Sequence, residues 1–519
     1  MSKILYEIRG NSYYDSVTLM LVSKEVEKID GVEKAIVGMG TELNKELAQN
    51  MGISNDQIEN ATPNDFFITA LADDTVEIDM ISQAVDEYLN KKQSDADDDY
   101  TPPTIRSAMQ HQPESNMVVI SVAGQYAAEE ARTALNNDMN VMIFSDNVSV
   151  EDERELKELA VDKGLLMMGP DCGTAIINNV PLAFANVIRK GNIGVVGASG
   201  TGLQEATVTI DKLGGGISQA IGTGGRDLSE DIGGLMMLQG IEALKQDANT
   251  EVILLISKPP ARSIAEKILG SIKDCEKPVV VDFIGGDGDL IEEYGAVASV
   301  SLEDAARKAV LLSKGEEPET FDSFSQSDQE IDKIVKKEVE KFDSEQKYYR
   351  GFFTGGTLAS EAINIVGTEI GQILSNVAEN PKDILEDNQK SVKNTVIDFG
   401  EDEFTVGRPH PMIDPSARLE RLPLEAEDGE MAVLMLDFVL GYGSNDDPIG
   451  ETIPKLNEAQ EIMKKAGKHL CVIASVCGTE NDPQDLLESQ KKLEENDVIV
   501  MQTNAQASRL AALIMKELQ

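Results

Sequence analysis

Short apolar runs alternate with helix-forming segments along most of this chain, and no other feature constrains its fold as strongly. Residues 117–122 form a continuous run rich in β-branched side chains, which is typical of a parallel strand buried on both faces. A helical pattern (127–137), a second apolar run (140–144) and another helical pattern (150–163) follow at the spacing of βαβ units. The pattern predicts an α/β protein with doubly wound parallel sheets, whose ligands bind beyond the carboxyl ends of the strands.

The same alternation indicates several domains. The chain has 519 residues, which exceeds what one hydrophobic core usually supports. An acidic stretch closed by two prolines and a charged, poorly apolar stretch are typical of linking segments. We therefore expect a small N-terminal α/β domain (1–93), a linker (94–110), a Rossmann-type unit (111–190), a second parallel-sheet unit (191–314), a charged connector (315–348) and a third α/β unit (349–519).

The charge of the chain restricts its partners. There are 92 acidic and 46 basic side chains, so the formal net charge is −46. This charge repels nucleic acid and anionic membrane surfaces. The N-terminus lacks the pattern of a signal peptide, and no apolar run approaches the ~20 residues that cross a bilayer. We expect a cytoplasmic protein that binds neither nucleic acid nor a membrane.

Cysteine usage agrees with that location. The four cysteines are widely scattered and lack the paired spacing of a structural zinc site. We expect reduced thiols. At Cys172 and Cys477 a packed small side chain is favoured over a nucleophile, because a reactive thiolate needs a nearby cation or base.

Two glycine-rich stretches, at 194–206 and 351–362, share one construction. In each, an apolar run enters a turn of small residues and a helix-forming segment leaves it. Such a turn brings free backbone N–H groups and the positive end of a helix dipole to one point, which suits a phosphate or carboxylate. Two such turns in one chain predict a single anion held between two helices. The residues expected to bind it are Ser199, Gly200, Thr201 and Gly202 in the first turn and Thr354, Gly355, Gly356 and Thr357 in the second. The alternative is that the glycines serve backbone geometry alone.

A further glycine pair follows the apolar run at 217–221. Gly224 and Gly225 precede Arg226, which would place backbone donors and a guanidinium at the end of a strand. Arg226 is therefore a candidate to clamp a carboxylate or phosphate. A salt bridge to Asp227 or Asp231 is the alternative.

Prolines flank one histidine in the third unit. Pro409 and Pro411 prevent a helix around His410, so its imidazole, which can titrate near neutrality, is held in a fixed loop. With Arg408 nearby, His410 is a candidate acid, base or hydrogen-bond donor, and Arg418 lies close in sequence. A purely structural histidine is the alternative.

Acidic residues supply two weaker candidates. Asp171 lies in a Gly-Pro-Asp turn at a strand end, where it can cap a helix or contact a ligand. Asp437 and the loop 441–447 follow another apolar run, and carboxylates in such a place can take Mg²⁺. A solvated acidic loop is the default alternative, and the metal stays unassigned.

Several motifs together resemble a known family. Gly-Pro-Asp-Cys-Gly (169–173) and the glycine-rich segment 191–201 resemble the α subunit of succinyl-CoA synthetase. The whole chain, with Gly-Arg-Pro-His-Pro at 407–411 and Ser-Val-Cys-Gly-Thr-Glu at 475–480, resembles the FdrA family. The resemblance implies that 111–190 is a CoA-binding-like Rossmann domain, 191–314 an α-type ligase domain and 349–519 a flavodoxin-type domain.

The departures from succinyl-CoA synthetase bear on mechanism. That family holds a phosphorylated histidine between two helix N-termini, in a loop that corresponds to 284–289 here, and this loop contains no histidine. The segment 257–262 carries Lys258 and Arg262 where acidic residues are expected, which favours direct anion binding. A nucleotide-grasp domain is not recognisable in the sequence, so ATP would bind to a partner subunit.

Three functions follow as expectations from the resemblance. FdrA-type proteins resemble a subunit of oxamate carbamoyltransferase, which converts oxalurate and phosphate to oxamate and carbamoyl phosphate in anaerobic allantoin catabolism with other subunits. This is our main expectation, because such a transfer needs a held phosphate and charge stabilisation but no covalent intermediate. An acyl-CoA synthetase using CoA and a partner's ATP is the first alternative, and a non-catalytic assembly or regulatory subunit is the second. No cofactor is certain, although Mg²⁺ is possible.

Overall fold

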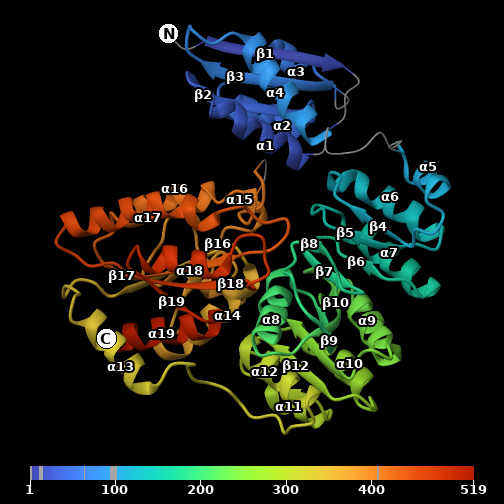
Figure 1. The fold of residues 1–519 in the computed structure, drawn as a ribbon, viewed down its shortest axis with the longest axis vertical. Coiled ribbons are helices and arrows are strands. Elements are labelled where there is room, and N and C mark those ends of the chain that lie inside the picture. Colours follow the sequence, from blue (N-terminus) through green and yellow to red (C-terminus); the bar gives the residue numbers. More distant parts are fainter. Residues whose placement is uncertain are drawn as a thin grey trace. The chain divides into compact units, whose positions relative to one another are not determined.

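The computed structural model describes residues 3–10, 14, 16–62, 65–93, 102–405 and 408–518, in two compact units (Figure 1). The first unit comprises Met1–Ser115, Ser121–Tyr126 and Thr405–Pro409, and the second comprises the rest of the chain. Within the described residues, no helix is both long and apolar enough to cross a membrane. The predicted α/β fold class is confirmed.

The first unit contains a small antiparallel sheet of strand order β1-β3-β2, with β3 in the middle. Its packing explains the alternating sequence pattern, since α1 and α4 cover one cluster of buried side chains and α2 and α3 cover a smaller one around Phe67. The elements are β1 (Lys3–Gly10), α1 (Ser16–Glu27), β2 (Val32–Met39), α2 (Glu42–Asn50), α3 (Asp56–Glu59), β3 (Asp65–Ala72), α4 (Ile78–Gln93) and α5 (Ile105–His111).

Helix α5 corrects part of the expected linker. Residues 94–101 lie outside the described residues, but the end of the predicted linker is helical. Thr104 caps this helix by accepting a hydrogen bond from the backbone N–H of Ser107, and Ser107 caps Thr104 in return. Two prolines favour a linker, but the capping box that directly follows them starts a helix.

The second unit begins with a three-stranded parallel sheet of order β4-β5-β6. Its strands are short, and β5 and β6 are mostly buried. Strand β4 lies at the edge of this sheet and leaves Val119 49% exposed, so the expected burial of the β-branched run on both faces is wrong. The elements are β4 (Met117–Ile120), α6 (Gly124–Asn136), β5 (Asn140–Ile143), α7 (Val150–Lys163) and β6 (Met167–Met168).

A seven-stranded sheet follows, of order β13-β12-β11-β9-β10-β7-β8. We expected the preceding domain to extend to residue 190, but β7 pairs antiparallel with β10 and therefore belongs to this sheet. The elements are β7 (Thr174–Ile177), β8 (Val180–Ala183), β9 (Lys190–Gly197), α8 (Gly200–Lys212), β10 (Ile217–Gly222), α9 (Leu235–Gln246), β11 (Val252–Ser257), α10 (Arg262–Ile272), β12 (Val279–Phe283), α11 (Gly288–Glu293), β13 (Val297–Ala298) and α12 (Leu302–Ser313).

The last sheet is six-stranded and parallel, of order β15-β16-β14-β17-β18-β19. The predicted strand 498–501 is observed with the same bounds. The elements are α13 (Asp328–Val339), β14 (Tyr348–Phe353), α14 (Gly356–Ile370), β15 (Leu374–Ser375), η1 (Pro381–Asp383), β16 (Thr395–Asp398), α15 (Asp402–Thr405), α16 (Ser416–Glu425), β17 (Met431–Val439), α17 (Pro448–Lys465), β18 (Cys471–Cys477), α18 (Leu486–Glu494), β19 (Val498–Met501) and α19 (Asn504–Glu517).

The expected connector 315–348 contains a packed helix. Ile331 and Val335 of α13 are buried in the main core, and Glu338 lies 2.7 Å from the imidazole Nε2 of His469. Helix α13 contacts α19. The many charged residues of this segment favour a linker. Its apolar residues, however, recur at i and i+4, which is the spacing of an amphipathic helix.

The two large sheets share one hydrophobic core. Buried residues of both sheets and of α8, α12, α14 and α19 form a single cluster. Helix α14 packs against both α19 and α8, and α12 packs against α8. This packing holds α8 and α14 against each other.

Candidate site where two helices begin

The first glycine-rich turn joins β9 to α8. Ser199 is the N-cap of α8, and its hydroxyl accepts a hydrogen bond of 2.9 Å from the backbone N–H of Gly202. Ser199 and Thr201 are both buried. The turn therefore has the capped geometry that the sequence predicts for the start of a helix.

The second turn joins β14 to α14, and its backbone donors bind a carboxylate that is distant in sequence. The N–H groups of Thr354 and Gly355 donate to the Asp437 carboxylate at 2.8 and 3.1 Å. Arg418 balances this carboxylate from 2.9 Å. Thr354 and Gly355 were predicted to bind an anion, but their backbone donors already hold one of the protein's own carboxylates. Gly356 and Thr357 are the first two residues of α14.

The two turns meet directly. The hydroxyls of Ser199 and Thr357 lie 2.5 Å apart, although 158 residues separate them in sequence. A methyl group on Gly355 would lie 2.6 Å from Thr201 Cγ2, and one on Gly202 would lie 2.9 Å from Thr357 Cγ2. At these two positions glycine is therefore required for the close approach of the helices, and that approach also brings two helix dipoles to one place.

A lysine lies beside the start of α14. Lys258 directly follows β11, and its Nζ is 3.3 Å from the position of a Cβ on Gly356. Its side chain is partly buried, and in the described part of the chain no carboxylate lies within ion-pair distance of its ammonium group. Lys258 thus adds a full positive charge to the partial charge of the helix N-terminus.

A buried carboxyl group faces the same point. Asp398 ends β16, and its Oδ2 lies 2.5 Å from the position of a Cβ on Gly356. Its Oδ1 accepts a 2.8 Å hydrogen bond from the N–H of Gly400. Burial and the nearby charge of Glu401 raise the pKa of Asp398 to about 7, although Lys258 acts in the opposite direction. A group with this pKa exchanges a proton near neutral pH.

His410 lies at the edge of this cluster. Its Nε2 is 2.9 Å from the position of a Cβ on Gly400, and its Nδ1 accepts a 3.2 Å hydrogen bond from the N–H of Met412. The neutral ring therefore carries its proton on Nε2. Desolvation lowers the pKa of His410 to about 4, below the near-neutral range that we expected, so the ring is neutral at pH 7.

Arg408, which precedes His410 in the same sequence motif, is assigned to the other unit. It is an exposed residue of the first unit, whereas His410 belongs to the second. Gly407 of the same motif lies outside the described residues. The predicted pairing of Arg408 with His410 stays a prediction.

The candidates around Arg226 form a neighbouring loop cluster. Gly224 has a φ of +87°, and a Cβ there would lie 2.9 Å from Gly169, so the two loops are in close contact. Asp171 lies 3.6 Å from the position of a Cβ on Gly225. The alternative salt bridge from Arg226 to Asp227 or Asp231 is not formed. The guanidinium of Arg226 instead contacts the carboxylate of the buried Glu153 at 3.0 Å.

Asp227 has a structural role. It accepts hydrogen bonds from the first N–H groups of α9 and binds the fully buried Lys157 at 2.9 Å. Burial raises the pKa of the Cys172 thiol to about 12 and also raises the pKa of the Cys477 thiol well above its usual value, as expected for packed thiols. Within the described residues, no three metal-ligating side chains gather at one point, and Asp437 is paired with Arg418.

Sequence reasoning missed Asp398 and the Asp437–Arg418 pair. Asp398 had a signal, because a carboxylate directly after a buried run lies at the ligand-binding edge of a parallel sheet. The contact of Asp437 with Thr354 spans 83 residues, and no local pattern indicates it.

Three family models match the chain. They describe an AllF heavy metal-associated domain (1–103), a CoA binding domain (188–285) and a CoA-ligase (352–514). YahF of Escherichia coli (strain K12) is 47% identical over 504 residues, which cover 97% of each protein. The chain belongs to the FdrA family. Its two large sheets thus have the domain architecture of CoA ligases, and the CoA binding domain matches the seven-stranded sheet instead of residues 111–190.

Other proteins that are similar to this chain are more distant from it. The malate–CoA ligase subunit alpha of Methylorubrum extorquens is 27% identical over 206 residues, which cover 37% of this chain and 67% of that protein. The solved structure of PH0766 from Pyrococcus horikoshii OT3 is 14% identical with a TM-score of 0.31, covering 77% of this chain and 84% of that one.

The description of the first family model implies a metal, and the residues do not fit one. Heavy metals of this class prefer thiolate or imidazole ligands. Residues 1–103 contain neither cysteine nor histidine, since the first of each are Cys172 and His111. The N-terminal domain of this FdrA protein therefore lacks the thiolate and imidazole ligands of such a site.

Proposed function

We propose that this chain is a CoA-ligase-type subunit that binds a phosphoryl or carboxylate anion where α8 and α14 begin and exchanges an acyl group between phosphate and a thiol. The contact between Ser199 and Thr357 carries the proposal, because it joins two helix N-termini at one point. The matches to CoA-binding and CoA-ligase models support the class of reaction.

Each group at the site would have a distinct part. The N–H groups of Gly356 and Thr357 lie in the first turn of α14, where no intrahelical acceptor exists, so they would donate to the anion. Lys258 would neutralise its charge. Asp398 would accept or return the proton of the attacking nucleophile, and His410 would donate through Nε2. ATP, with its Mg²⁺, would bind to a partner subunit.

Carbamoyl transfer between phosphate and oxamate is the second candidate. The observation that favours it is the absence of histidine from residues 284–289, because direct transfer to a bound phosphate requires no phosphohistidine. The same helix N-termini would hold carbamoyl phosphate, and other subunits would complete the enzyme.

One assay separates the two candidates. The purified chain, alone and with the proteins encoded beside it, is given acetyl or succinyl phosphate with CoA, or carbamoyl phosphate with oxamate. Phosphate release that requires CoA and yields a thioester supports the ligase. Release that requires oxamate and yields oxalurate supports the carbamoyltransferase. Anion binding without either reaction supports an assembly subunit.

The site itself is tested by sulfate binding. Lys258→Met is expected to weaken binding by about tenfold, because a charge-assisted contact is lost. Lys267→Met is the matched control, since Lys267 lies on α10 and donates to the carbonyl of Gly233. Equal affinities of the two variants, measured by calorimetry, would remove Lys258 from the site.

A further inference from the structure

The N-terminal sheet ends on one side in an open strand. Within the described residues β1 pairs only with β3, so its other edge has no neighbouring strand. The strand is eight residues long and carries two exposed apolar side chains, Ile4 (40% exposed) and Tyr6 (38%). Long edges with exposed apolar side chains pair readily with another strand, and proteins usually protect them.

The opposite edge of the sheet is different. Strand β2 likewise pairs only with β3 among the described residues, but its exposed positions are Glu33 and Lys34. Charged side chains, lysine above all, discourage pairing at a sheet edge. The open edge of β1 is therefore the better docking surface.

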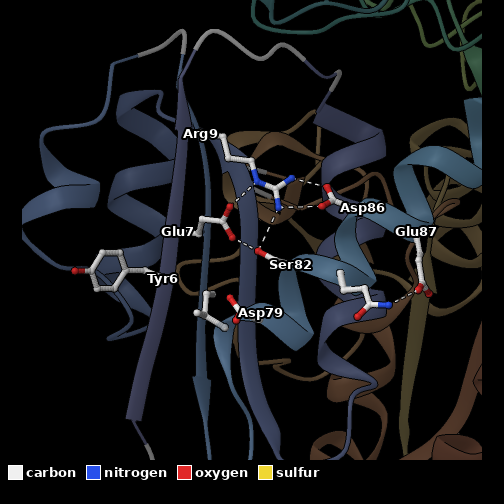
Figure 2. Close-up of a pocket in the computed structure, with 9 residues that line it drawn as sticks. Tyr6, Glu7, Arg9, Asp79, Ser82, Asp86 and Glu87 are labelled. Atoms are coloured by element: carbon white, nitrogen blue, oxygen red, sulfur yellow. Dashed lines mark hydrogen bonds and ion pairs between the residues drawn. The ribbon is translucent and has the colours of Figure 1, made fainter.

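Beside β1 lies a groove of about 630 Å³ between the strand and α4. Figure 2 shows Glu7 and Arg9 on the side of β1 that faces α4, whereas Tyr6 points to the other side. Arg9 binds Glu7 at 2.8 Å and Asp86 at 2.5 Å, and the Ser82 hydroxyl also donates to Glu7.

Carboxylates dominate this groove. Glu7, Asp79, Asp86 and Glu87 line it together with the single guanidinium of Arg9. Asp79 and Glu87 are exposed on α4. A strand added beside β1 would therefore meet an acidic surface on the α4 side and an apolar one, formed by Ile4 and Tyr6, on the other.

We propose that the edge of β1 docks an extended segment of a partner protein that carries Lys or Arg at alternate positions and apolar side chains between them. Alternate side chains of a strand face opposite sides, so the basic ones would face α4 and the apolar ones would cover Ile4 and Tyr6. Main-chain hydrogen bonds to β1 would supply affinity, and the groove would supply selectivity.

Charge disfavours two other occupants of this edge, namely a second copy of the chain and the chain's own acidic segment. A second copy pairing edge to edge would bring the carboxylates of its own α4 against Asp79 and Glu87, which repels. The chain's segment 95–99 contains four aspartates and has the same sign of charge. A basic partner segment is the complementary one.

The full chain is tested with an octapeptide of alternating lysine and valine, and with its glutamate–valine counterpart. Hydrogen exchange should slow in residues 3–10 with the lysine peptide and stay unchanged in β2. By fluorescence anisotropy, Asp79→Asn/Glu87→Lys should weaken peptide binding about tenfold. Glu46→Lys, on the exposed surface of α2, should leave it unchanged.

Several results would overturn the proposal. Unchanged exchange of β1 at saturating lysine peptide is one, and equal binding of the glutamate peptide is another. An equal loss of affinity in Glu46→Lys would make the effect one of general charge. Protection of β1 that grows with protein concentration in the absence of peptide would assign the edge to a second copy instead.

Discussion

At the scale of single residues, Asp398 determines how the site responds to pH. Its pKa is raised to about 7, so the carboxyl group is largely protonated at pH 6 and ionised at pH 8. The ionised form lies beside the start of α14, where it repels an anion.

Sulfate binding should therefore weaken about tenfold between pH 6 and pH 8, because sulfate keeps its charge over that range while Asp398 gains one. His410 does not titrate there, since its pKa is about 4. In Asp398→Asn the affinity, measured by calorimetry, should be nearly constant with pH. An unchanged pH dependence in that variant would assign the titration to another group.

Asp437 is a residue whose importance is structural. It accepts from Thr354 and Gly355 and balances the buried guanidinium of Arg418. Asp437→Asn leaves that guanidinium without its counter-charge, so the free energy of unfolding should fall by about 3 kcal/mol in urea denaturation. Asp446→Asn, in an exposed loop of the same sheet, should change it by less than about 0.5 kcal/mol. A small effect of Asp437→Asn would show that water replaces the carboxylate.

At the scale of elements, the local sequence pattern predicts the strands and the turns. It does not predict which residues contact those turns. The apolar run 498–501 and the helix starts at Ser199 and Gly355 can be predicted from the sequence, because apolar content, capping and glycine act within a few residues. Asp437 and Asp398 reach α14 through tertiary contacts, which periodicity does not encode.

The pKa of His410 shows the same limit. Its flanking prolines indicate a fixed loop, but the desolvation that lowers its pKa comes from elements distant in sequence. The Phe184 ring, for example, lies 5.5 Å from the imidazole, although the two residues are 226 positions apart in the sequence.

Helix α14 offers a direct comparison of two glycines. A methyl group on Gly356 would contact Asp398, whereas one on Gly367 meets only Ile373 at 3.7 Å. Gly356→Ala should abolish measurable sulfate binding. Gly367→Ala should preserve it and raise the free energy of unfolding by about 0.5 kcal/mol, because alanine favours a helix. Full binding in Gly356→Ala would place the anion elsewhere.

At the scale of the whole molecule, the net charge of −46 acts on folding. Self-repulsion destabilises the compact state, and salt screens it. Raising NaCl from 20 to 200 mM should therefore increase the melting temperature by a few degrees, with KCl acting equally. A decrease in calorimetric melting temperature would mean that ion pairs outweigh the repulsion.

Because Ser199 and Thr357 belong to one polypeptide, diluting the protein should not separate the two helix N-termini. Ser199 and Thr357 lie 158 positions apart on one polypeptide, so bringing the two helices together costs loop-closure entropy once, during folding. Their encounter is then governed by a fixed effective molarity instead of the amount of protein present. In an enzyme that assembles the two helices from separate subunits, this junction would come apart at low concentration; here it persists in a single isolated molecule.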